Sequence, residues 1–139
     1  MHVASALPPF DPAAFRDRRD QLIDHMNAAG GGVALIPGSR EIARNRDTHF
    51  PFRQDSYFHY LSGFGEPDAV IALVAGDTPR HILFCREKDE EREIWDGFRY
   101  GPSAAVDAFA FDEATTIGNL PVRMLELLHG QGQLWVSLG

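Results

Sequence analysis

Two apolar segments around a short turn cluster constrain the fold of this chain more than any other feature. Residues 69–75 read AVIALVA, residues 81–85 read HILFC, and the cluster Gly-Asp-Thr-Pro occupies positions 76–79 between them. Apolar runs of this length are typical of buried β-strands, and Gly, Asp and Pro favour a turn. We therefore predict a β-hairpin that pairs residues 69–75 with residues 80–85.

A helix is predicted near residues 12–29. Asp11-Pro12 is a helix-start pair, because Asp accepts a hydrogen bond at the N-cap and Pro fits the first helical position. Apolar residues then recur close to every 3.6 positions at Phe15, Leu22, Ile23 and Met26, while Arg16, Arg18, Arg19 and Asp20 are assigned to the polar surface. The three glycines at positions 30–32 end the helix.

Further strands are expected at residues 33–36, 57–61, 108–111 and 134–138. A helical stretch is expected from Asp112 or Glu113 to about Leu128, interrupted near residues 118–121. Helices mixed among strands indicate an α/β domain with a mixed β-sheet flanked by helices. Residues 1–10 are expected to form a flexible tail, and residues 11–139 a single domain.

Composition narrows the possible functions. The chain has 139 residues and a formal net charge of −7, which argues against nucleic acid as a partner, since phosphate binding needs clustered Lys and Arg. Apolar runs are too short for a membrane span, and the N-terminus lacks the pattern of a secretory signal. A single cysteine, Cys85, cannot form an internal disulfide, so a cytoplasmic location is expected. The sequence stops directly after an apolar strand pattern, which suggests a piece of a longer protein.

No metal site and no catalytic residue emerge from the residues themselves. Six histidines occur, but none lies in an HExxH pattern, and no CxxC accompanies them. The densest group is Asp47, His49, Asp55 and His59, where a strand at residues 57–61 favours a packed His59 over a ligand. Cys85 is interpreted as a buried small apolar residue, and the acidic run at residues 87–93 as a solvated surface loop.

The segment EIWDGFRYGP, residues 93–102, has two open interpretations. It combines Trp95, Phe98 and Tyr100 with arginines and glycines directly after the charged run. Large aromatic residues in a polar, glycine-containing loop are good contact residues, so an interface or substrate contact is one interpretation. Ordinary packing beneath the loop is the other.

Three blocks of the sequence resemble the N-terminal domain of bacterial aminopeptidase P, the Xaa-Pro aminopeptidase. They are FRDRRDQLIDHM, RNRDTHFPFRQDSYFHYLSGFGEPDAV and FCREKDEEREIWDGFRYGP. The central block matches the pattern D-x-x-[FY]-P-[FY]-R-Q-x-S-x-[FY]-x-Y-[FL]-[ST]-G-F-x-E-P throughout. The resemblance covers roughly residues 11–139 and implies the creatinase N-terminal-like, ribonuclease-H-like fold.

The resemblance also implies a function. In this family, catalysis belongs to a C-terminal pita-bread domain that binds two Mn²⁺ or similar ions, and the bond cleaved precedes a proline in the second position of a peptide. That domain is absent here, so no cofactor is expected in this chain and it should be inactive alone. The N-terminal domain serves oligomer assembly, as a dimer or a tetramer, and substrate access.

Two residues receive family roles by their position in the motifs. Trp95 matches the tryptophan that reaches toward a neighbouring subunit's active site, and Asp47 matches an aspartate that lines the access region between subunits. Asp96 departs from the pattern by adding a negative charge beside the tryptophan. The alternative function is a non-catalytic, creatinase-like peptide-binding module, and the sequence beyond Gly139 would discriminate between the two. A complete small enzyme is the weakest hypothesis.

Overall fold

A five-stranded mixed sheet forms the centre of the computed structural model, which describes residues 10–40 and 52–137. The strands lie in the order β4-β3-β2-β1-β5. Their bounds are Val33–Pro37 for β1, Val70–Val74 for β2, Arg80–Cys85 for β3, Glu113–Thr116 for β4 and Leu134–Val136 for β5. The pairs β1–β2 and β2–β3 are antiparallel, whereas β3–β4 and β1–β5 are parallel. The expected class, a mixed sheet flanked by helices, is therefore confirmed.

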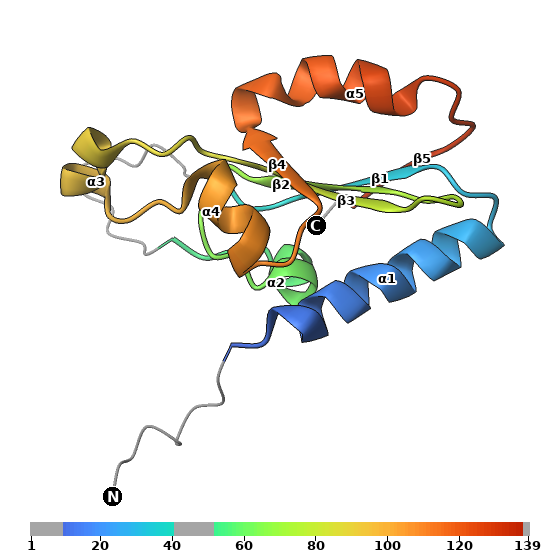
Figure 1. The fold of residues 1–139 in the computed structure, drawn as a ribbon, viewed down its shortest axis with the longest axis horizontal. Helices are drawn as coiled ribbons and strands as arrows, with labels where there is room; N and C mark the ends of the chain where they lie inside the picture. Colours follow the sequence, from blue (N-terminus) through green and yellow to red (C-terminus); the bar gives the residue numbers. More distant parts are fainter. Residues whose placement is uncertain (1–9, 41–51, 138–139) are drawn as a thin grey trace, which may run out of the picture.

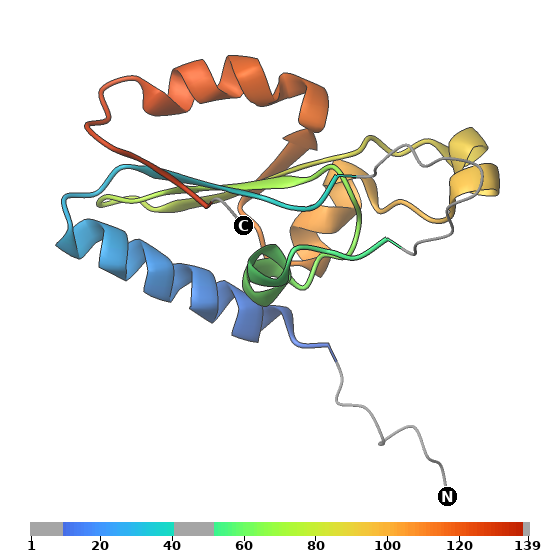
Figure 2. The ribbon, with the colours of Figure 1, turned by 180° about the vertical axis from the view of Figure 1, so that it is seen from behind.

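Helices cover both faces of the sheet (Figures 1 and 2). The helices α1, Pro12–Ala28, and α2, Ser56–Ser62, lie on one face together with α4, Gly101–Ala108. The opposite face carries α5, Leu120–Leu128, which follows the short 3-10 helix η2, Ile117–Asn119. The remaining helix α3, Glu90–Asp96, lies beyond the sheet at one end of the long axis. Among the residues that the structure describes, no helix combines the length and apolar character that a membrane crossing needs.

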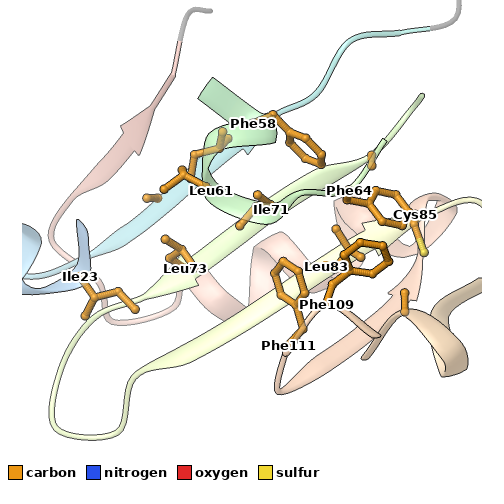
Figure 3. Packing of buried hydrophobic residues seen from close by; sticks show 14 of the residues in the cluster. Ile23, Phe58, Leu61, Phe64, Ile71, Leu73, Leu83, Cys85, Phe109 and Phe111 are labelled. Carbon is orange, nitrogen blue, oxygen red and sulfur yellow. The ribbon is translucent and has the colours of Figure 1, made fainter. Parts of the chain in front are cut away.

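The two faces of the sheet carry separate apolar clusters, because successive side chains on a strand point to opposite sides. In β3, Leu83 and Cys85 join the larger cluster beneath α1, α2 and α4, whereas Ile82 and Phe84 join the cluster beneath α5. Figure 3 shows the larger cluster around Phe58, Phe64, Leu83, Phe109 and Phe111. Both faces of β2 and β3 are buried, so their sequences read as continuous apolar runs instead of alternating ones.

The predicted hairpin and first helix are confirmed within one residue at each boundary. In the hairpin, Ile71 pairs with Leu83 and Val74 with Arg80. The Asp11 side chain accepts a hydrogen bond from the backbone nitrogen of Ala13 and begins α1, as the sequence indicated. The strands expected at residues 33–36 and 134–138 are also present, as β1 and β5.

The strand predicted at residues 57–61 is wrong, because this segment is the helix α2. Its aromatic composition favours a strand, but both ends carry helix caps that outweigh this preference. The Asp55 carboxylate accepts from the backbone nitrogen of Phe58 at 2.9 Å, and Gly63 ends the helix in the left-handed conformation with φ 69°. The helix buries Phe58 and Leu61, three positions apart and therefore on one helical face.

The predicted order of strand and helix at residues 108–128 is also wrong. The predicted strand at 108–111 begins on the last residue of α4, and the strand β4 lies where the helix was expected to begin. Residues 113–116 form a strand because β3 offers its free edge there: Ile82 lies opposite Glu113 and Cys85 opposite Thr116. The helical stretch begins only at Leu120, with Pro121 in its first turn.

Candidate functional site

Among the residues that the structure describes, the most exposed large apolar side chain lies on α3, with two others on it and directly after it. Trp95 is 83% exposed, Ile94 76% and Phe98 63%. Figure 1 shows α3 extending beyond the end of the sheet, joined to the body by the segments that follow β3 and precede α4. Isolated apolar residues are ordinary on a surface, but a clustered group of this size is typical of a contact site.

Local chemistry explains why α3 is a helix and not the solvated loop that we expected for the acidic run. Asp89 is the N-cap, and its carboxylate accepts from the backbone nitrogen of Arg92 at 3.1 Å. Glu90, Glu91 and Glu93 follow in the first turn, where negative charge interacts favourably with the helix dipole. Gly97 ends the helix with φ 96°, a conformation that favours glycine.

A small polar cluster connects the residues that precede α3 to the residues that follow it. The Lys88 ammonium donates to Glu93 Oε1 at 3.0 Å and to the carbonyl oxygen of Arg99 at 2.8 Å, and the backbone nitrogen of Arg99 donates to the same Glu93 oxygen at 3.1 Å. We call these three residues the α3 clasp. The bond from the Arg99 backbone, followed by the one from Lys88, lowers the pKa of Glu93, which keeps the carboxylate charged.

Buried Glu66 connects the clasp to the body of the domain. One of its carboxylate oxygens accepts from the backbone nitrogen of Tyr100 at 2.7 Å, and the other lies 3.4 Å from the Arg86 guanidinium. The Tyr100 ring in turn packs edge-on against buried Phe109, with ring centroids 4.9 Å apart. Lys88, Glu93 and Glu66 were not predicted from the sequence, although the helix-start pattern at Asp89 was a signal that could have placed α3.

The structure places one of the two residues that received a family role. Trp95 lies on the outward face of α3, so the interpretation of residues 93–102 as wholly packed beneath a loop is wrong for this side chain. Tyr100, in contrast, is partly buried and packs against the larger apolar cluster. Asp47 lies outside the described residues, and so does His49 from the histidine group. Of that group, Asp55 caps α2 and His59 is exposed on it.

A second cluster of titratable groups lies on the α1 face, around Arg19 and His81. Both side chains are fully buried, so the assignment of Arg19 to the polar surface is wrong. Arg19 Nε donates to His81 Nδ1 at 2.9 Å, and its other nitrogens donate to the carbonyl oxygens of Leu61, Phe109 and Ala110. Because Arg can only donate, Nδ1 carries no hydrogen, and His81 Nε2 donates to Asp20 at 3.0 Å.

These contacts indicate that the Arg19–His81 cluster joins structural elements. Burial, followed by the positive charges of Arg19 and Arg16, lowers the pKa of His81 to about 4. The Arg19 guanidinium also lies 3.9 Å from the centre of the Phe111 ring. The cluster therefore links α1, the end of α2, β3 and the segment that precedes β4.

Cys85 lies fully buried at the end of β3, as the sequence interpretation required. Burial, together with the nearby negative charge of Glu66, raises the pKa of its thiol to about 12. A thiol with such a pKa is a poor nucleophile at neutral pH. Within residues 10–40 and 52–137, no group of three or more His, Cys, Asp and Glu side chains could hold a metal ion.

An open, mainly apolar groove of about 360 Å³ lies between α1 and the edge of the sheet formed by β1 and β5. Leu22 and Met26 of α1, Ile36 of β1, Trp135 of β5 and Tyr57 of α2 are among its lining residues. Like the surface around Trp95, this groove offers mainly apolar contact area, although His25 and Ser137 also line it. Both surfaces offer the kind of apolar area that typically binds a partner.

Comparisons with known proteins confirm the resemblance found in the sequence. A family model described as the N-terminal domain of aminopeptidase P matches residues 15–135. The Xaa-Pro aminopeptidase of Escherichia coli K12 is 38% identical over 127 residues, which are 90% of this chain and 28% of that protein. The Xaa-Pro aminopeptidase 3 of Dictyostelium discoideum is 37% identical over 113 residues, which are 80% of this chain and 21% of that protein.

Solved structures give the same result for the fold. Escherichia coli aminopeptidase P in complex with substrate superposes with a TM-score of 0.85 at 32% identity, over 95% of this chain and 30% of that one. Pseudomonas aeruginosa aminopeptidase PepP also gives a TM-score of 0.85, at 36% identity over 96% of this chain and 30% of that one. The chain thus spans at most 30% of the length of these four proteins.

Proposed function

Because this chain belongs to the family of aminopeptidase P N-terminal domains, we propose that it is the non-catalytic N-terminal part of a metal-dependent Xaa-Pro aminopeptidase. The longer protein would remove the N-terminal residue of peptides that have proline in the second position. The similarity to Xaa-Pro aminopeptidases over 90% of this chain supports this function. A location in the cytoplasm is part of the same proposal.

The chemistry of hydrolysis is assigned to the part of the protein outside this chain. The described residues offer no donor set for the two Mn²⁺ or similar divalent ions that the proposed function requires. In this proposal Cys85 and His81 have no catalytic role, which the complete burial of both side chains supports. The domain contributes by binding and by shaping access.

The exposed indole of Trp95 is the observation that carries the proposed role in access and assembly. In an oligomer, it supplies a flat apolar wall to the substrate entrance of an adjacent subunit, and Asp47 lines the same region. Such a wall helps to hold a short peptide without touching the reacting atoms. An anchoring aromatic residue of this kind commonly contributes about 2 kcal/mol to binding.

Steady-state kinetics of the longer protein test this proposal. We expect Trp95→Ala to raise KM for short Xaa-Pro peptides about thirtyfold while kcat and metal content stay unchanged, because the lost contact serves binding and not chemistry. Tyr60→Ala is the matched control, since this aromatic residue is 50% exposed on α2, outside α3 and outside the apolar surfaces of α5 and β5. An unchanged KM in the Trp95 variant would refute the entrance role. A longer protein that cleaves no Xaa-Pro peptide, with or without Mn²⁺, would instead support a peptide-binding module.

A further inference from the structure

The helix α3 is held to the domain by polar contacts and not by apolar packing. None of its seven residues is buried, and two of its large apolar side chains, Ile94 and Trp95, face solvent. An amphipathic helix is normally oriented by the apolar face that it packs against the core. Since α3 has no such face, its rotation about its own axis must be fixed by other contacts.

Glu93 is the residue of α3 that faces inward. Its side chain is only 13% exposed, whereas Trp95, two positions later, is 83% exposed. Successive residues of an α-helix are rotated by about 100°, so two positions separate the side chains by about 200°. Contacts that hold Glu93 on the inner side therefore turn Trp95 outward.

The partners of Glu93 are themselves fixed to the body of the domain. A Cβ added to Gly101 would lie 2.7 Å from the Cβ of Lys88, so these two backbone segments are in close contact. Arg99, the other partner, is 8% exposed and precedes Tyr100, whose backbone nitrogen is bound by Glu66. The Lys88 ammonium also lies 4.4 Å from the centre of the Phe98 ring, which adds a cation–π contact.

We propose that Lys88 and Glu93 are positioning residues that set the orientation of α3 and thereby present Trp95 to the substrate entrance. The role of Trp95 at the entrance rests on the proposed function, whereas the effect of the α3 clasp on the orientation of α3 does not depend on that function. Glu93 acts through two hydrogen bonds to one carboxylate oxygen, and Lys88 joins that oxygen to the end of the segment. Loss of either residue frees α3 while the sheet and its two apolar clusters stay intact.

Hydrogen exchange of the 139-residue chain tests the clasp directly. We expect Glu93→Ala and Lys88→Met each to accelerate amide exchange at residues 97–99 about tenfold, with no change in the β2–β3 hairpin, because only the local opening is affected. Lys88→Arg, which keeps a cation, should restore slow exchange. The matched control is Glu91→Ala, which removes the same charge from an exposed position of the same helix. Equal exchange in the Glu93 and Glu91 variants would overturn the proposal.

A double-mutant cycle in the longer peptidase tests whether the clasp acts through Trp95. We expect Glu93→Ala to raise KM about tenfold with kcat unchanged, and the double variant with Trp95→Ala to be no worse than Trp95→Ala alone. If the increase in KM of the double variant equals the product of the two single increases, Glu93 acts independently of Trp95, and the positioning role is overturned. If Trp95→Ala has no effect on KM while Glu93→Ala still accelerates exchange, the entrance function fails and the clasp remains.

Discussion

At the scale of single residues, Arg19 and His81 show how a buried polar pair is tolerated. Four donor contacts and the Phe111 ring compensate the Arg19 guanidinium for the loss of water. The pair requires that His81 stays neutral, because a protonated ring would place two positive charges in contact. The stability of the domain is therefore linked to the protonation of one histidine.

The pH dependence of unfolding follows from this link. Burial lowers the pKa of His81 from the ordinary 6.5 to about 4 in the folded state, so the unfolded chain binds this proton more readily. Neutral His81 contributes fully to the free energy of unfolding above pH 6.5. As the pH falls toward 4, the free energy of unfolding decreases by about 3 kcal/mol in all. Urea unfolding between pH 7 and pH 4 should show this loss in the natural sequence and in a His25→Gln control, and a weaker dependence in His81→Gln. Parallel slopes in the two variants would contradict the assignment.

Trp95 provides the opposite case, a large apolar residue without a structural role. Since its side chain is 83% exposed, we expect Trp95→Ala to change the free energy of unfolding of the 139-residue chain by less than about 0.5 kcal/mol. Phe64→Ala, at a fully buried position, should cost about 3–5 kcal/mol in the same denaturant titration. A loss of several kcal/mol for Trp95→Ala would identify it as a core residue and would rule out the entrance role.

At the scale of secondary-structure elements, caps decide between helix and strand in α2. The segment between Asp55 and Gly63 contains aromatic residues that favour strands, yet the carboxylate at one end and the glycine at the other bind the free backbone groups of a helix. The same device begins α1 at Asp11 and α3 at Asp89. The seven-residue helices α2 and α3 therefore depend strongly on single residues at their ends.

Gly63→Ala is the sharpest test of this dependence. The residue has φ 69°, and an added Cβ would lie 2.5 Å from a ring carbon of Phe10 and 2.9 Å from one of Phe15. We expect a loss of about 2 kcal/mol or more in the free energy of unfolding, since backbone strain and overpacking combine. Gly65→Ala is the control, because no atom lies within 4 Å of its added Cβ and its φ is not in the left-handed region. Thermal unfolding of both variants distinguishes strain at residue 63 from a general effect of losing glycine.

At the scale of the whole molecule, α5 and β5 are two further elements whose apolar side chains remain exposed among the described residues. On α5, Val122 and Leu125 are 62% and 76% exposed, and on the edge strand β5, Leu134 and Val136 are about half exposed. Phe111, in contrast, is buried in the larger apolar cluster. An edge strand with apolar side chains is a template for association.

We therefore predict that the 139-residue chain self-associates at moderate concentration, as a homodimer or a larger assembly. The physical reason is burial of the apolar side chains on α5 and β5 between copies. Light scattering over a concentration series measures the mass, and Leu125→Glu together with Val136→Glu should shift it toward the monomer. A monomer at high concentration in the unsubstituted chain would contradict the prediction, whereas an unchanged assembly in the double variant would exclude these two surfaces.

Local patterns in the sequence determined the hairpin, α1, β1, β5 and the family. Each of these depends on residues close together in the chain: an apolar run, a cap, a glycine stop or a motif. Cys85 was identified as buried for the same reason, since it ends an apolar strand. For Trp95, the sequence left contact and packing both open, and the structure shows the side chain exposed.

Only the tertiary structure decided the features that depend on distant partners. Residues 113–116 are a strand because the edge of β3, some 30 residues earlier in the chain, accepts them. Arg19 is buried because the carbonyl oxygens of Leu61, Phe109 and Ala110, 42 to 91 residues away, converge on it. The role of Glu93 depends in the same way on Lys88 and Arg99 meeting at one oxygen atom. Hydrogen bonds satisfy a buried charge only when folding has brought their donors and acceptors together. A local pattern of residue types does not indicate which distant donors and acceptors come into contact.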